Sequence, residues 1–212
     1  MDFALPPDDD PRRLEVRAWL AVHPNPSDRQ LHDAGYVVPH WPEPYGIDAD
    51  PIHQLIIHEE LRAAKVSGPA NPIGIGWAAP TIMLAGTEEQ KQRWLPKMAS
   101  GELVAGVCMS EPGTGSDLHA VATTAIRDGD EYILNGQKTF VTNGQSAELL
   151  VVVCKTDPSL GGRGISLLVV ETEEVEGFNL GGKGARLLQD KKLFDFENYP
   201  DCLLYTSDAA DE

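Results

Sequence analysis

The sequence Cys108-Met109-Ser110-Glu111-Pro112-Gly113-Thr114-Gly115-Ser116-Asp117 decides the fold, because it predicts a glycine-rich loop at the end of a strand. A second polar segment, Lys138-Thr139-Phe140-Val141-Thr142-Asn143, follows after further strand-like sequence. Gly113 and Gly115 permit positive φ and carry no Cβ, so successive backbone N–H groups can face an anion. Hydroxyl groups for the same site come from Ser110, Ser116 and Thr142. Hairpins between the two segments would bring them together around one ligand, and such a loop can cradle a diphosphate.

These residues also form part of a longer pattern. Taken alone, the glycines would suit a plain Pro-Gly turn between two strands. The runs Met109-Ser110-Glu111-Pro112-Gly113-Thr114-Gly115-Ser116-Asp117 and Asn135-Gly136-Gln137-Lys138-Thr139-Phe140-Val141-Thr142-Asn143-Gly144, however, closely resemble the two signature segments of the acyl-CoA dehydrogenase family of flavoenzymes. Upstream, Gly86-Thr87-Glu88-Glu89-Gln90-Lys91-Gln92-Arg93-Trp94-Leu95-Pro96 and Ser100-Gly101-Glu102 resemble the family too, in the same order and spacing. The resemblance covers roughly residues 14 to 204.

Composition and charge exclude several classes of protein. The 212 residues suffice for one large or two small domains, and a hydrophobic content of 42% is typical of a globular chain. The net charge of −16 disfavours nonspecific binding to nucleic acid or to an anionic membrane, because both require a basic surface. The N-terminus lacks the basic and apolar parts of a signal peptide, and no apolar run reaches the ~20 residues of a membrane span. We therefore expect a cytoplasmic protein.

The pattern of metal-ligating residues predicts no metal site. Cys108, Cys154 and Cys202 are widely spaced and odd in number, which argues against a zinc site and against a disulfide framework. His53 and His58 are not four residues apart on their predicted helix, so a solvated or core-rim position is favoured over metal ligation.

The region before Gly101 predicts helices. Asp10 and Asp50 each precede a proline and can cap a helix, and two capping boxes, Ser27 with Gln30 and Thr87 with Gln90, begin two more. Pro96 is expected to kink or shorten the helix that Thr87 begins. The helix after Asp50 has an apolar face and a face expected to be in water, the latter made of Glu59, Glu60, Arg62 and Lys65.

After Gly101 the period of the pattern changes to that of strands. Strand-like runs cover residues 104–109, 122–127, 131–134, 138–141, 149–155 and 165–171. The connections are too short for crossover helices, so we expect an antiparallel sheet. The fold class is therefore α+β: an N-terminal all-α domain over residues 1–103, an antiparallel β-barrel or sandwich over 104–204, and an unstructured tail over 205–212. A Rossmann site is disfavoured because the glycine loop leads into more β-structure and not into a long helix.

The resemblance implies a reaction and a cofactor. Acyl-CoA dehydrogenases convert acyl-CoA thioesters to trans-2-enoyl-CoA with FAD, which supplies the hydride acceptor that no side chain provides. By resemblance, Ser110 would bond the flavin edge, Ser116 would reach the acyl-CoA, Phe140 would cover one flavin face and Thr142 would bond near N5. The residues so assigned to the cofactor are Val107, Cys108, Met109, Ser110, Gly115, Ser116, Phe140, Val141 and Thr142. Phe140-Val141-Thr142 replaces the Trp-Ile-Thr common in the family, which keeps the stacking but loses an indole N–H.

The sequence departs from the family at its end, where the resemblance runs out around residues 200–204. The family continues into a helical domain that carries the catalytic glutamate, so the base is expected beyond residue 212. Glu111 is a candidate substitute, although in the family it belongs to the loop scaffold. Two interpretations remain open: part of an acyl-CoA dehydrogenase, inactive alone, or a non-catalytic acyl-CoA- or flavin-binding module. An acyl-CoA oxidase is a further alternative. The implied partners are acyl-CoA, electron-transfer flavoprotein and further subunits of a homo- or hetero-oligomer.

Overall fold

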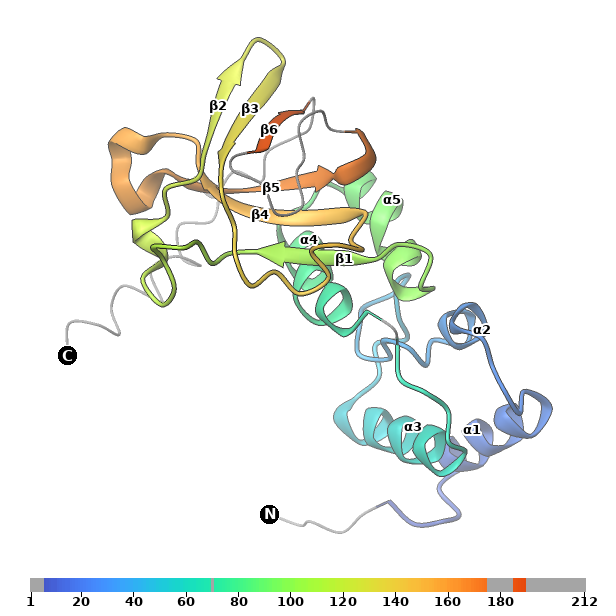
Figure 1. Cartoon of the computed structure of the whole chain (residues 1–212). Coiled ribbons are helices and arrows are strands. Elements are labelled where there is room, and N and C mark those ends of the chain that lie inside the picture. Colours follow the sequence, from blue (N-terminus) through green and yellow to red (C-terminus); the bar gives the residue numbers. More distant parts are fainter. Residues whose placement is uncertain (1–5, 70, 175–184, 190–212) are drawn as a thin grey trace, which may run out of the picture.

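A computed structural model describes residues 6–69, 71–174 and 185–189. Helices come first along the chain and strands follow, as the α+β prediction requires (Figure 1). The α-helices are α1 Pro11–Val22, α2 Asp28–Asp33, α3 Pro51–Ala63, α4 Ala79–Ala85 and α5 Glu88–Ala99, with a π-helix, η1, at Gly74–Ala78. The strands are β1 Ala105–Cys108, β2 Thr124–Asp128, β3 Glu131–Gly136, β4 Leu149–Lys155, β5 Ile165–Glu171 and β6 Ala185–Gln189. Short 3-10 helices lie at Leu118–Ala120, Pro158–Gly164 and Thr172–Glu174.

The helix starts are where the sequence places them. Asp10 and Asp50 cap α1 and α3 by accepting backbone N–H groups. Both capping boxes form, with Ser27 and Gln30 at α2 and with Thr87 at α5. Pro96 does not shorten α5, which continues through it to Ala99. Capping depends on residues that are close in sequence, which is why these predictions are confirmed.

The sheet is mixed, so the expectation of an antiparallel sheet is wrong. Its strand order is β1-β4-β2-β3-β6, and β5 also pairs with β4. The pairs β2–β3, β3–β6 and β4–β5 are antiparallel, whereas β1 and β2 each pair with β4 in parallel. The crossover from β1 to β4 consists of loops, the short 3-10 helix Leu118–Ala120 and the β2–β3 hairpin, and over these described residues it contains no α-helix. The short connections between strands adjacent in sequence do not reveal this return, because β1 and β4 are not adjacent in sequence.

Strand β4 is buried on both of its faces and joins the helices to the sheet. Leu149 and Val151 pack in one core with Ile82 of α4 and Trp94 of α5. The alternate residues of β4 lie in a second core, whose members from β2 and β3 are Ala125 and Leu134. The hairpin β2–β3 therefore curls over the face of β4 that the helices leave open. Burial on both faces explains why residues 149–154 read as one continuous apolar run.

A buried ion cluster joins α1 to α3, which corrects the assignment of Glu60 to a solvated face. Arg13 and Glu60 are each only 6% exposed. Arg13 donates to Glu60 Oε1 at 2.6 Å and to Glu59 Oε2 at 2.7 Å, and Arg17 Nε donates to Glu60 Oε2 at 2.9 Å. Leu14 of α1, by contrast, is apolar and 50% exposed. The charged pair Arg13–Glu60 is therefore buried between the helices, and helical periodicity alone cannot identify such a buried charge.

Three parts of the sequence predictions reach outside the described residues. The tail over residues 205–212 lies there entirely, and so do the last residues of the predicted β-domain and Cys202. The placement of a domain boundary between residues 103 and 104 stays a prediction.

Candidate functional site

The two polar segments singled out in the sequence lie against each other. Thr139 N–H donates to Ser110 O at 2.9 Å, and Lys138 Nζ donates to Met109 O at 3.1 Å. The first segment follows β1 directly, and the second lies in the connection from β3 to β4. The two segments are adjacent because β1 and β4 pair in parallel. The end of β1 and the start of β4, which the second segment precedes, therefore belong to neighbouring strands.

The first segment presents main-chain groups and small side chains at the surface. Val107, Met109 and Ser110 are half-buried, and Gly115 and Ser116 are exposed. Neither Gly113 nor Gly115 adopts positive φ, so that part of the argument for these glycines is wrong. A Cβ built on either meets nothing within 4 Å, however, so the expectation of an open approach is confirmed.

Cys108 is buried in the second core. Burial raises the pKa of its thiol to about 12, so the thiol remains protonated at neutral pH. Only the main chain of Cys108 can therefore take part in a surface site. Among the described residues, no group of three or more His, Cys, Asp and Glu is arranged to hold a metal ion.

Glu111 is a structural carboxylate at the base of the loop. It is 7% exposed and accepts hydrogen bonds from Ala122 N at 2.7 Å, Thr123 N at 3.0 Å, Thr123 Oγ1, and Lys138 Nζ at 2.8 Å. Three of these donors bond Oε1 and one bonds Oε2, so both oxygens accept hydrogen bonds. Burial by itself would raise the pKa of Glu111, but these hydrogen bonds lower it to about 2. A carboxylate held in this way is a poor proton acceptor, which argues against Glu111 as the catalytic base.

The second segment is a loop, which corrects the strand predicted over residues 138–141. Phe140 has φ of 57° and is 97% exposed. Positive φ is costly for a bulky residue, and an exposed aromatic ring forgoes its hydrophobic stabilisation. Val141 is half-buried and Thr142 is exposed. The backbone thus holds the ring of Phe140 in solvent, two residues before the exposed Thr142.

Asn71 and Asn143 join the helical region to this loop, and sequence reasoning assigned neither a function. Asn143, with φ of 64°, donates from Nδ2 to Asn71 Oδ1 at 2.8 Å and to Ala105 O at 3.2 Å. Asn71 is 2% exposed and also accepts from Gly74 N at 3.0 Å. The local pattern Asn-Pro before an apolar helical segment could have indicated a helix cap at Asn71. Its partner 72 residues away could not be found locally.

The residues present fit a large planar cofactor along one wall. The exposed ring of Phe140, the exposed hydroxyls of Ser116 and Thr142, and the open space at Gly113 and Gly115 lie on the two joined segments. An aromatic ring can stack on a flavin, and hydroxyl groups can bond its polar edge. One wall would leave much of such a ligand in water, whereas ligand sites normally bury most of it.

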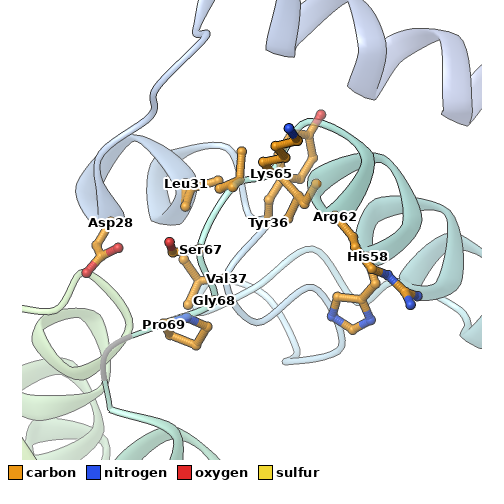
Figure 2. Close-up of a pocket in the computed structure, with 12 residues that line it drawn as sticks. Asp28, Leu31, Tyr36, Val37, His58, Arg62, Lys65, Ser67, Gly68 and Pro69 are labelled. Carbon is orange, nitrogen blue, oxygen red and sulfur yellow. The ribbon is translucent and has the colours of Figure 1, made fainter.

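A separate pocket of about 370 Å³ lies in the helical region (Figure 2). It is lined by Asp28, Leu31, Tyr36, Val37, His58, Leu61, Arg62, Lys65, Val66, Ser67, Gly68 and Pro69. None of the nine residues predicted to bind a cofactor lines it. Among the described residues, no helix has both the length and the apolar character that crossing a membrane requires.

We expect the stabilisation by Glu111 to depend on pH in a defined direction. Its folded pKa of about 2 lies below its ordinary value of 4.5, so the ionised carboxylate stabilises the fold above that ordinary value. This contribution is lost as the pH falls through the folded pKa. Glu111→Gln removes it, so the free energy of unfolding in urea should fall less steeply between about pH 6 and pH 2 than in the wild type. Equal slopes in the two proteins would contradict the assignment.

Two family models match this chain. A family model for the acyl-CoA dehydrogenase N-terminal domain matches residues 11–102, and one for the middle domain of the same family matches residues 106–187. The chain is 43% identical over 150 residues to acyl-CoA dehydrogenase FadE34 of Mycobacterium tuberculosis, covering 69% of this chain and 21% of that protein. FadE26 of the same organism is 41% identical over 71% of this chain and 38% of its own length.

A solved structure has the same fold. The crystal structure of acyl-CoA dehydrogenase from Geobacillus kaustophilus superposes with a TM-score of 0.59 at 39% identity, covering 86% of this chain and 53% of that one. The chain therefore spans from about a fifth to about half of the length of these proteins.

Proposed function

Because this chain belongs to the acyl-CoA dehydrogenase family, we propose that it is part of a flavin-dependent enzyme that oxidises an acyl-CoA thioester to the trans-2-enoyl-CoA. FAD, when bound, accepts the hydride that leaves the β-carbon. The described residues would form the wall that orients the cofactor and the thioester. The observation that carries this proposal is Phe140, an exposed aromatic ring held at positive φ beside the glycine loop. Strain of this kind is typical of functional sites.

Each residue of the wall has a proposed role. Phe140 covers one face of the flavin, Thr142 bonds near N5, and Ser110 bonds the polar edge. Ser116, exposed further along the loop, contacts the acyl-CoA. Main-chain or apolar contacts to FAD come from Val107, Cys108, Met109, Gly115 and Val141, with the buried thiol of Cys108 excluded. Exposure of Ser116 and Thr142 supports these roles, since neither side chain is enclosed by the core.

The catalytic base is proposed to lie outside this sequence. Glu111 is the buried carboxylate of the first segment, and four donors hold its oxygens. We therefore expect the 212-residue chain to hold FAD weakly and to lack dehydrogenase activity. A cytoplasmic location, an electron-transfer flavoprotein as electron acceptor and further subunits complete the proposal. A crystal structure of the ChsE4-ChsE5 complex from Mycobacterium tuberculosis supports the last point, with a TM-score of 0.65 at 32% identity.

Two other functions stay open. A non-catalytic module would bind FAD or acyl-CoA through the same wall but would never turn over, even within its full-length protein. An acyl-CoA oxidase would use the same wall and differ in how the reduced cofactor is reoxidised. Assaying the full-length protein that contains this sequence, with oxygen or with an electron-transfer flavoprotein as acceptor, separates all three.

The proposed role of Phe140 predicts the result of a binding experiment. FAD is titrated into the purified chain and followed by flavin fluorescence anisotropy. Removing the ring by Phe140→Ala should weaken FAD binding about tenfold through lost stacking and apolar contact. Ile126→Ala provides the control, because Ile126 is also an exposed apolar residue, 47% exposed on β2, and lies outside the site.

Two results would contradict the proposal. Equal affinity of the Phe140→Ala variant and the wild type would remove Phe140 from the site, and absence of FAD binding at millimolar concentration would remove the wall itself. Acyl-CoA added to the FAD-loaded chain should leave the flavin absorbance unchanged. Robust bleaching would show that the base is present in this chain.

A further inference from the structure

We propose that Lys138 is a positioning residue, which holds the segment bearing Phe140 and Thr142 against the glycine loop and so sets the spacing of the two halves of the flavin wall. This inference rests on the proposed function for its ligand. It concerns a side chain that is not expected to touch either the cofactor or the substrate. The side chain of Lys138 is 10% exposed and that of Glu111 is 5% exposed.

The ammonium group of Lys138 lies against the first segment. Lys138 Nζ donates to Glu111 Oε1 at 2.8 Å and to Met109 O at 3.1 Å, and both of these acceptors are in the first segment. The next residue adds a main-chain link, Thr139 N–H to Ser110 O at 2.9 Å. Phe140 follows immediately. Three hydrogen bonds from two consecutive residues therefore fix the chain directly before the strained aromatic position.

Glu111 would still accept hydrogen bonds from other donors if Lys138 were absent. Ala122 N, Thr123 N and Thr123 Oγ1 all come from the chain that continues the first segment, and they serve both carboxylate oxygens. Lys138 is the donor that comes from the second segment. Burying its charge costs solvation free energy, which the charged hydrogen bond offsets in a surrounding of low dielectric constant. This charged hydrogen bond, from Lys138 to Glu111, joins the two segments.

The buried pair Lys138–Glu111 differs from the exposed pair Lys91–Glu88 of the same chain. Lys91 Nζ and Glu88 Oε1 are 2.7 Å apart, but both belong to the first turn of α5 and Glu88 is 73% exposed. Such a pair contributes little and fixes nothing outside its helix. The two lysine pairs have nearly the same length, so they differ in burial and in what they connect. Lys91→Met is therefore the matched control for Lys138→Met.

The test measures the spacing of the segments separately from cofactor binding. Hydrogen exchange of the Thr139 amide is followed by NMR in the 212-residue chain, under conditions where every variant is folded. Lys138→Met should accelerate exchange at Thr139 at least about tenfold, whereas Lys91→Met should not change it. Thr123→Val removes a different donor from Glu111 and should also leave Thr139 protected. If Lys138→Met does not fold, Lys138→Gln, which keeps an N–H donor group but removes the charge, replaces it in the same comparison.

The second measurement is FAD affinity by anisotropy. Lys138→Met should raise the Kd for FAD about tenfold, and the two control variants should bind as the wild type does. Unchanged exchange at Thr139 overturns the inference, and so does accelerated exchange with unchanged FAD affinity. Failure of the wild-type chain to bind FAD refutes the proposed function. In that case the exchange data still decide whether Lys138 fixes the two segments.

Discussion

Glu60→Ala is expected to lower the free energy of unfolding by about 3–5 kcal/mol, because it leaves a buried guanidinium without one of its two carboxylate partners. Glu60 accepts hydrogen bonds from both Arg13 and Arg17, and its side chain is 7% exposed. Arg13 would keep Glu59, which it contacts at 2.7 Å, but would lose the 2.6 Å contact on its other terminal nitrogen. Urea denaturation at neutral pH measures the loss.

Two variants test whether the loss comes from the unpaired charge. Glu59→Ala removes a carboxylate that is 26% exposed and should cost about 1 kcal/mol or less. The double variant Arg13→Met/Glu60→Leu removes both charges from the interior and should recover most of the stability that Glu60→Ala loses. A double variant as unstable as Glu60→Ala would show that packing volume, and not charge, causes the loss.

Asn71→Ala is expected to lower the free energy of unfolding by roughly 2–4 kcal/mol, since each buried polar group left without a partner costs about 1–3 kcal/mol. The backbone N–H of Gly74 loses its acceptor, and the side-chain amide of Asn143 loses its shorter hydrogen bond and keeps the one to Ala105 O at 3.2 Å. Removing Asn71 also frees the loop that carries Phe140 from the helical region. The variant should therefore bind FAD more weakly as well as unfold at lower urea concentration.

Gln54→Ala is the matched control for Asn71→Ala. Gln54 donates one side-chain hydrogen bond, to Ala49 O at 2.8 Å, and is only partly buried. Its loss should cost about 1 kcal/mol and leave FAD affinity unchanged. If both variants lose the same stability, the special role of Asn71 is wrong.

Features that depend on neighbouring residues could be predicted from the sequence. The caps at Asp10, Asp50, Ser27 and Thr87 form as predicted, and β4 and β5 have the predicted bounds, residues 149–155 and 165–171. The two polar segments also lie together as predicted, and they could be found because their residue types are unusual over a short stretch.

Features that depend on distant partners could not be predicted. Nothing near Glu60 indicates Arg13, which lies 47 residues earlier. Nothing near Asn143 indicates Asn71, and Glu111 shows its structural role only once Lys138 is placed beside it. The parallel pairing of β1 with β4 has the same origin, since it depends on where the chain returns after the β2–β3 hairpin. In each case the local pattern fixes the residue type but leaves the partner open.

The central position of β4 also has a consequence for the order of folding during synthesis. Ile82 and Trp94 of the helices share a core with Leu149 and Val151, so their apolar surface is only partly covered until the ribosome has released residues past 151. Parallel pairing of β1 with β4 must likewise wait for about forty further residues, and contacts so distant in sequence form slowly. The nascent helices therefore spend that interval with exposed apolar faces, the condition in which chaperones bind and aggregation begins.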